Sequence, residues 1–449
     1  MSIGIKIKKG LDLNIAGSLP EGSAGAAPRA TATVALVPDD FIGLIPKMEL
    51  REGDSVKAGQ PLFHSKLDER LKIVSPASGT VKAVVRGERR KILRVVVEVT
   101  DGPAETFDVK NALKNRESAR ALLLASGQWA MMRQRPYDIV PAADAVFRDI
   151  FVTGFDSAPL AWYRTEFSAE EIADMEAAVK LLALLTDGKV YVTRREGMNL
   201  PELKGAETVD VAGPHPASNA GTAIAAVKPV NKGETVGCLD LPTLLRIGRL
   251  LRTGTLDCTT TVAVTGSEVK EPCLISTLIG AEIAPLLKGN LKEDGRHKRI
   301  ISGNVLTGTA VAEEAYLRLP YRQITVIPEG DDVDEFMGWA SLSPSKQSTS
   351  PSFPGHFFSK KLFTPDARLL GGRRAMIMSG QYDKVFPMDI LPEYLIKAII
   401  ARDIDRMEQL GIYEVAPEDF ALAEYVDTSK LELQKIVREG LDYLRKELS

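Results

Sequence analysis

The sequence predicts a multidomain protein that combines α/β and α+β folds and ends in helices. Three observations lead to this fold class. Residues 1–110 are rich in glycine, proline and short β-branched runs, residues 111–255 alternate strand-like and helix-like segments, and the chain is predicted to be helical after Leu391. The length of 449 residues fits two to four domains of ordinary size.

Residues 1–110 are expected to form a compact β-barrel or sandwich, because several short strands follow one another at close spacing. Two segments, REGDSVKAGQPLF (51–63) and SPASGTV (75–81), resemble the half-motifs of the biotinyl/lipoyl carrier fold. Carrier domains present a lysine flanked by methionine or acidic residues, and neither Lys66 nor Lys72 has that context. We therefore expect a structural barrel without covalent biotin or lipoate.

Residues 111–255 are predicted to form a domain with a parallel sheet, because strands and helices alternate along them. The clearest helix covers residues 168–188, where Ser168 and Glu171 have the spacing of a capping box. The other predicted elements are a helix at 115–126 and strands at 149–155, 189–193 and 208–213.

The remaining chain is divided into two further parts. Residues 256–330 are expected to be a small α+β unit, with strands at 259–267, 298–303 and 323–328 and a helix near 276–288. Residues 331–449 begin with a loop-rich segment and continue with helices near 392–410, 417–426 and 429–448. Proline or an N-cap residue stands at the start of each of these helices.

The composition argues against several classes of protein. The formal net charge of −3 gives no global sign of a nucleic-acid partner. The three cysteines are too far apart for an iron–sulfur or zinc motif, and the four histidines show no metal-binding spacing, so no metal site is predicted. No apolar run approaches the ~20 residues that span a bilayer, and no signal peptide is visible, so a cytoplasmic location is expected.

A basic cluster is predicted on a hairpin at RGERRKILR (86–94). Its cationic side chains are a solvated strand face in one interpretation and a docking surface for an anionic membrane or an acidic partner in the other. The candidate docking residues are Arg86, Arg89, Arg90 and Lys91.

A second segment, SGQWAMMRQRPYDIVP (126–141), combines aromatic residues, methionines and two arginines. A quinone ring needs apolar or aromatic walls and one or two donors to its carbonyl oxygens, and this segment offers both. The alternative is a packed helix end whose arginines pair with acids elsewhere in the chain.

A third segment, GPHPASNAGTAI (213–224), follows a predicted strand at a position where α/β sheets bind ligands. The segment lacks both the GxGxxG and the GxxxxGK[ST] pattern, so it gives only weak support for a nucleotide site. No arrangement of a nucleophile with a base is apparent, and we predict no catalytic residue in this chain.

Seven segments together resemble one family, the A subunits of the Na+-translocating NADH:quinone oxidoreductases. These segments occur in the family's order and spacing over essentially the whole chain. They are KIKKGLDLNIAG (6–17), FIGLIPKMELREGDSVKAGQPLF (41–63), SPASGTVKAVVRGERRKIL (75–93), SGQWAMMRQRP (126–136), DIFVTGFDSAPLA (149–161), GPHPASNAGTAI (213–224) and FPMDILP (386–392).

The resemblance implies a barrel-sandwich region over residues 1–110, a Rossmann-like domain over 111–255, an SLBB-like β-grasp unit over 256–330 and a helical domain within 331–449. It implies no tightly bound cofactor in this chain, with the flavins and the iron–sulfur centre in partner subunits. The related C subunit of Rnf-type complexes carries two cluster motifs near its C-terminus. Residues 274–449 of this chain contain no cysteine, so that version is excluded.

The resemblance also implies a role at a membrane. The family's A subunit lies peripherally on the cytoplasmic face of the bacterial inner membrane and takes part in quinone binding with the membrane B subunit. The implied quinone-binding residues are Phe41, Trp129, Met132, Arg133, Arg135, Pro136 and Tyr137. Family members often have phenylalanine at the position of Met132, so a stacking ring is absent there.

Three hypotheses remain. The first is a quinone-site subunit of the Na+-exporting complex, inactive when isolated. The second is a pure scaffold without its own ligand. The third is a carrier or nucleotide-binding enzyme built from the same folds.

Overall fold

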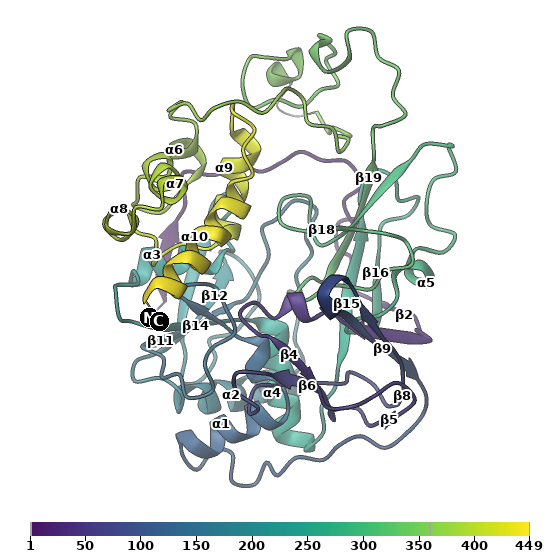
Figure 1. The fold of residues 1–449 in the computed structure, drawn as a ribbon, viewed down its shortest axis with the longest axis vertical. Coiled ribbons are helices and arrows are strands. Elements are labelled where there is room, and N and C mark those ends of the chain that lie inside the picture. The colour runs from purple at the N-terminus through teal and green to yellow at the C-terminus, as the bar shows by residue number, and fades with distance from the viewer. Residues whose placement is uncertain (1, 359–360, 449) are drawn as a thin grey trace.

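The structure is a computed structural model that describes residues 2–358 and 361–448. The chain folds into an α/β unit, two β-rich units and a C-terminal group of helices, which lie against one another in Figure 1. This architecture confirms the predicted combination of α/β and α+β folds.

A six-stranded sheet forms the centre of the α/β unit, in the order β1-β13-β12-β11-β14-β10. Neighbouring strands are parallel, except that β10 runs antiparallel to β14. The direction of winding reverses between β11 and β14, which is where doubly wound sheets bind ligands. The strands are β1 Ile3–Lys6, β10 Arg133–Arg135, β11 Asp149–Thr153, β12 Val190–Arg195, β13 Glu207–Ala212 and β14 Val236–Asp240.

Alternate residues of these strands face two separate cores. Ile150 and Val152 pack with helices α1, α2 and α4, whereas Phe151 between them packs with helix α3 on the other face. The sheet is therefore covered on both sides, as expected for a mainly parallel sheet. These helices are α1 Arg116–Ala125, α2 Ala169–Ala183, α3 Ala220–Val227 and α4 Leu241–Thr253.

Helix α2 begins as predicted. The backbone N–H of Glu171 donates to Ser168 Oγ, and the backbone N–H of Ser168 donates to the Glu171 carboxylate at 3.0 Å, which completes the capping box. The helix ends at Ala183, before the predicted end at residue 188, because the chain turns there and Thr186 Oγ1 donates to the carbonyl of Phe147.

Helix α4 was missed by the sequence-based prediction. The Asp240 carboxylate caps its N-terminus by accepting from the backbone N–H of Thr243 at 2.8 Å. Gly248 lets the helix approach α2, since a Cβ at this position would lie 2.0 Å from the carbonyl oxygen of Asp174. This close contact with α2 fixes the rotation of α4 about its own axis.

The N-terminal β unit consists of two small sheets, in the orders β3-β9-β8-β5 and β4-β6-β7. Their inward side chains share one core, which includes Val34, Leu62 and Val97. The strands are β3 Thr33–Leu36, β4 Pro46–Met48, β5 Ser55–Val56, β6 Pro61–Ser65, β7 Lys72–Val74, β8 Gly79–Arg86 and β9 Ile92–Val99.

The second β-rich unit contains a six-stranded sheet in the order β18-β17-β19-β15-β16-β2. The helix predicted near 276–288 is wrong over its first part, because residues up to Leu278 pair antiparallel with β15 as strand β16. Only a short helix, α5, follows. The elements are β2 Ala27–Pro28, β15 Thr259–Thr265, β16 Cys273–Leu278, α5 Ile283–Leu287, β17 Lys298–Ser302, β18 Thr309–Val311 and β19 Gln323–Pro328.

The C-terminal helices form a core of their own. The predicted helix at 392–410 is broken at Arg402, whose φ of 53° is left-handed. The last helix begins later than predicted, because the Asp427 carboxylate accepts from the backbone N–H groups of Ser429 and Leu431 and holds them in a turn. The helices are α6 Tyr382–Val385, α7 Pro392–Ala401, α8 Ile404–Gln409, α9 Ala421–Val426 and α10 Leu433–Leu448.

We predict that Gly248→Ala lowers the free energy of unfolding of the α/β unit by about 1–3 kcal/mol, because the added methyl group is forced onto backbone atoms of Asp174. Thermal unfolding measures the change. Gly289→Ala is a weaker control, since nothing lies within 4 Å of its added Cβ and only its φ of 76° is unfavourable. Equal losses in both variants would contradict the packing argument.

Candidate functional site

A cavity of about 790 Å³ lies where the α/β unit, both β-rich units and the C-terminal helices meet. The carboxyl ends of β11 and β14 open into it through Gly154 and Asp240. The N-terminal β unit contributes Phe41, the second β-rich unit contributes Arg322, and the C-terminal helices contribute Arg438. The cavity thus combines the ligand-binding edge of a doubly wound sheet with walls from every other unit.

Three of the seven predicted quinone-binding residues line this cavity: Phe41, Arg133 and Arg135. The other four belong to the surrounding framework. Trp129 and Met132 are buried in the main core of the α/β unit, and Trp129 Nε1 donates to the carbonyl of Pro141 at 3.1 Å. The quinone role of the whole set stays a prediction.

Pro136 and Tyr137 lie directly after β10. Pro136 is buried and follows a cis peptide bond, and Tyr137 has a left-handed φ of 77°. Tyr137 packs against the core of the C-terminal helices, and its carbonyl accepts from Arg438 Nη2 at 2.7 Å. These two residues connect strand β10 to helix α10.

Arg135 is 1% exposed and is held by two carboxylates from the 3-10 turn Pro417–Phe420. Arg135 Nη2 donates to Glu418 Oε1 at 2.8 Å, and Nη1 lies 3.4 Å from Asp419 Oδ2. Burial alone would lower the pKa of Arg135, but the neighbouring carboxylates outweigh burial and raise it. The same burial raises the pKa of both Glu418 and Asp419, against the opposing effect of Arg135.

Arg133 is in a different environment. Among the described residues, its guanidinium donates only to backbone carbonyls, those of Ala130 and Met132 at 3.4 Å and that of Asp40. Burial lowers the pKa of Arg133, although the nearby carboxylates Asp138 and Asp40 act in the opposite direction. The Asp40 side chain is occupied by Arg318, with Arg318 Nη2 2.6 Å from Asp40 Oδ1. Arg133 therefore presents a cation at the cavity wall without a carboxylate bound directly to it in the described chain.

The predicted basic hairpin is present and exposed. Arg86 ends β8, and the tip Glu88–Arg90 carries Arg89 and Arg90 with left-handed φ angles. Lys91 lies 2.7 Å from the Asp39 carboxylate, so part of its charge is compensated within the chain. The docking role of these residues stays a prediction.

His215 lines the cavity, is buried and has its ring held by the surrounding fold. Its Nδ1 lies 3.0 Å from Ser157 Oγ, and its backbone N–H donates to Asp12 Oδ1. Burial lowers the pKa of His215 to about 4, so the ring is neutral near pH 7. The carboxylate of Asp12 binds the backbone and not the ring, so the pair with Ser157 lacks the orienting acid of a hydrolytic triad.

Two of the three cysteines, Cys238 and Cys258, are free and buried. Burial raises the pKa of the Cys238 thiol to about 12 and that of Cys258 to about 11. Thiolates, which are the nucleophiles and metal ligands, are therefore disfavoured at both positions.

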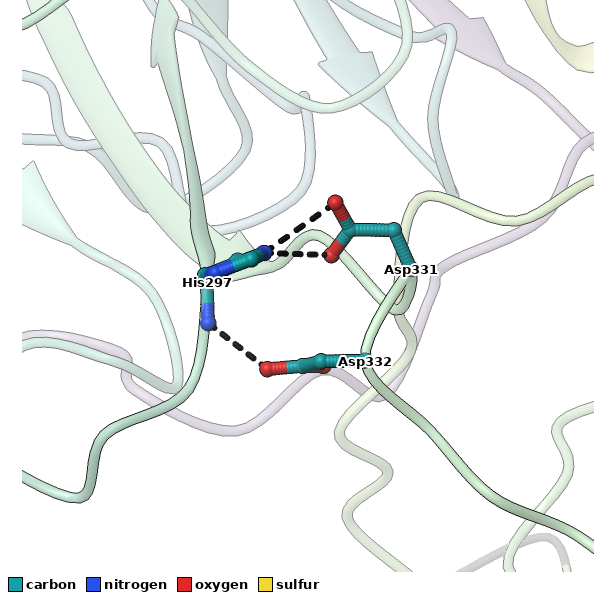
Figure 2. Close-up of side chains that lie close together, drawn as sticks. All are labelled: His297, Asp331 and Asp332. Carbon is teal, nitrogen blue, oxygen red and sulfur yellow. Dashed lines mark hydrogen bonds and ion pairs between the residues drawn. The ribbon is translucent and has the colours of Figure 1, made fainter.

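One group of possible metal ligands was missed by sequence reasoning. His297 Nδ1 lies 3.0 and 3.1 Å from the two carboxylate oxygens of Asp331, and the backbone N–H of His297 donates to Asp332 Oδ2 at 2.8 Å (Figure 2). All three residues are exposed. A hydrogen bond to Asp331 raises the pKa of His297, so these contacts are satisfied by a proton on the ring without any ion.

Comparison with known proteins assigns the chain. Residues 5–100 match the NqrA N-terminal barrel-sandwich hybrid domain, residues 114–256 the NqrA second alpha/beta domain, and residues 261–313 the NQRA C-terminal domain of SLBB type. A protein of Serratia proteamaculans, named as the A subunit of a Na(+)-translocating NADH-quinone reductase, is 40% identical over 99% of this chain and 100% of its own length. The chain belongs to this NqrA family.

Other members of the NqrA family show the same full-length match. Proteins with the same name from Neisseria meningitidis serogroup B and Pasteurella multocida are 38% and 37% identical, each over 99% of this chain and 100% of the relative. The domain matches also confirm the predicted barrel-sandwich, α/β and SLBB-like units. Within the described ranges, every helix is too short or too polar to cross a bilayer.

A NAD+-reducing [NiFe]-hydrogenase structure is also similar, with 13% identity and a TM-score of 0.36 over 78% of this chain and 68% of that chain. This likeness is too low to support a conclusion about the NqrA-family chain.

We predict that Arg135→Met destabilises the protein by about 3–5 kcal/mol, because Glu418 and Asp419 lose the cation that compensates them. Thermal unfolding measures the loss, and adding Asp419→Asn to the variant should restore part of it. Arg86→Met, on the exposed hairpin, should change stability by no more than about 0.5 kcal/mol. Equal stability of the Arg135 and Arg86 variants would contradict the role of the buried cluster.

We also predict that the His297 ring titrates above its ordinary pKa of 6.5. Because the folded-state pKa is raised, this contact stabilises the fold below the ordinary pKa and the contribution disappears as pH rises through the folded-state pKa. Side-chain NMR titration measures the midpoint, which Asp331→Asn should lower. Asp332→Asn is the matched control and should have a smaller effect, since Asp332 binds the backbone of His297.

Proposed function

We propose that this chain, working within a Na+-translocating NADH-quinone reductase, forms part of a quinone site at the large cavity. The complex would couple NADH oxidation and quinone reduction to Na+ export. The chain itself would contribute no tightly bound cofactor, the flavins and the iron–sulfur centre belonging to other subunits. The observation on which the proposal rests is the side-by-side placement of apolar side chains and Arg133 on one wall of the cavity.

The apolar part of this wall suits a planar ring. Phe41, Ile42 and Met131 line the cavity next to one another in the fold, since the turn Pro38–Asp40 lies against the segment after α1. Phe41 is fixed by edge-to-face packing on Phe63, with ring centroids 6.1 Å apart. A quinone ring could therefore lie on a rigid apolar surface.

Arg133 supplies the polar contact. Its guanidinium is held by carbonyls of Ala130, Met132 and Asp40, which fix its orientation without neutralising its charge. A quinone carbonyl accepts hydrogen bonds, and its oxygen becomes more negative on reduction, so a fixed cation favours the reduced state. Arg135 is less suited to this role, because Glu418 and Asp419 already pair with it.

Assembly with partner subunits is the second part of the proposal, and the partner nearest to the quinone is expected to be the membrane B subunit. The loops between β19 and α6 project beyond the rest of the molecule in Figure 1 and expose several large apolar side chains. Such a concentration of apolar surface is typical of protein–protein interfaces. The most exposed of these residues are Phe336, Leu342 and Phe357, at 88%, 74% and 73%.

We place the complex-bound chain on the cytoplasmic face of the bacterial inner membrane, where partner subunits would hold it. The basic residues Arg86, Arg89 and Arg90 would then add a surface for acidic partner residues or anionic lipid. If the cavity binds no quinone, the chain is a scaffold in which only these docking surfaces have a function.

We predict that Arg133→Gln in the purified complex raises the quinone KM about ten- to one-hundred-fold, the cost of one lost hydrogen bond to a charged group. Steady-state kinetics with a water-soluble quinone measures the change. Electron transfer from NADH to an artificial acceptor upstream of the quinone should stay unchanged.

Two further variants sharpen this test. Arg133→Lys keeps the charge but loses the planar fork, so an intermediate KM is expected. Arg86→Gln removes an exposed cation outside the cavity and should leave the quinone KM unchanged. An unchanged KM in an intact Arg133→Gln complex would reject the quinone site and leave the scaffold function.

A further inference from the structure

Helix α4 turns one face toward the cavity. Pro242, Leu245, Arg246 and Arg249 all line it, and their spacing of three and four residues places them on one side of the helix. A neighbouring side of the helix is fixed against α2, where Gly248 meets the backbone of Asp174 and Arg252 pairs with the Asp174 carboxylate at 2.8 Å. The orientation of the cavity-facing arginines is therefore set by packing.

Arg246 differs from Arg249 and Arg252 on the same helix, because no carboxylate of the described chain forms an ion pair with it. It is 7% exposed, and no hydrogen bond or ion pair to its guanidinium occurs within residues 2–358 and 361–448. Its Nε is buried without a partner, while the side chain as a whole lines the cavity. A buried cation that no counter-charge binds directly is costly, and Asp240 and Asp257 act on Arg246 only from beyond ion-pair distance, so a bound anion would lower this cost.

The neighbouring cations are already paired. Arg249 lies 2.9 Å from Glu171 and 3.1 Å from Asp257, Arg164 lies 2.6 Å from Glu171, and Arg322 lies 2.6 Å from Asp240. Glu171, Asp257 and Asp240 are therefore bound directly by other arginines, whereas Arg246 has no directly bound carboxylate in the described chain. Hydroxyl groups that could also bind an anion line the same cavity, on Thr259, Thr260 and Thr261. These residues directly follow Cys258, which lies near Arg246.

We propose that the Arg246 end of the cavity binds the phosphate group of a small molecule. Guanidinium forks match phosphate oxygens in a bidentate manner, and Arg246 is placed at the carboxyl end of β14, beside the point where the winding of the sheet reverses. This subsite is independent of the quinone proposal. The groups that act electrostatically on Arg246 are Cys258, Asp240, Arg322 and Asp257, and none of them is among those that act most strongly on Arg133.

The test is thermal unfolding of the full chain titrated with inorganic pyrophosphate, with sodium sulfate and sodium chloride at matched ionic strength as salt controls. Wild-type protein should show a saturable rise in Tm with pyrophosphate. Arg246→Gln should weaken this response at least about tenfold, the effect of losing one charge-assisted contact. Its Tm without ligand should not fall, because the variant removes a buried charge that no carboxylate of the described chain binds directly.

Arg252→Gln is the matched control, since it lies on the same helix but faces α2. Its Tm should fall, yet its pyrophosphate response should remain. Adenosine diphosphate and a short-chain phosphatidic acid, each added separately, distinguish a nucleotide from a lipid as the source of the phosphate.

Three results would overturn the proposal. One is the absence of any Tm response of wild-type protein to all three phosphate compounds at millimolar concentration. Another is an equal response of wild type and Arg246→Gln. The third is unfolding of ligand-free Arg246→Gln, which would show that the arginine has a partner within the fold. None of these measurements involves quinone, so their outcome neither supports nor rejects the proposed quinone site.

Discussion

Arg135 joins parts of the chain that are far apart in sequence. It ends the antiparallel edge strand β10 of the α/β sheet, and it meets Glu418 and Asp419 from the turn that precedes helix α9. Asn219, at the start of α3, adds a hydrogen bond to the carbonyl of Glu418 at 3.3 Å. Separating a charge buried to this degree from its counter-charges would be costly, so these ion pairs favour one position of the C-terminal helices against the sheet.

The cavity is a consequence of that fixed position. The α/β sheet offers an open edge at the ends of β11 and β14, and the C-terminal helices and the two β-rich units close around this edge without filling it. Cationic side chains at the wall then differ in what they can bind. Arg135 and Arg322 are neutralised by the protein, whereas Arg133 and Arg246 keep charge that no carboxylate of the described chain binds directly. The second pair is therefore better placed than the first to bind an anionic group or a carbonyl oxygen of a ligand.

An element could be predicted from the sequence where the interactions that form it join residues close together in the chain. The start of α2 could be predicted because Ser168 and Glu171 bind each other's backbone within one helical turn. The segment before Leu278 was misassigned, because an apolar run with β-branched residues fits a helix or a buried strand equally well and only its pairing with β15 decides.

The candidate site was only partly accessible to sequence reasoning for the same reason. The segment around Trp129 was found by its composition, but which of its side chains reach the cavity depends on β10 pairing with β14. The partners of Arg135 lie more than 280 residues away, with 283 residues separating it from Glu418. The lack of an ion pair at Arg246 could not be predicted from the sequence. It depends on the folded structure, in which the neighbouring carboxylates pair with other arginines.

Strand β1 has a consequence for the order of events during synthesis. Ile3 pairs with Val209, so strand β1 completes the edge of a sheet whose other strands are synthesised much later. At about 5–20 residues per second, roughly 10–40 s separate the synthesis of these two strands. During this interval β1 has unpaired backbone groups, while the β-rich region that follows it can already fold, so the α/β unit is completed only after that region has been made.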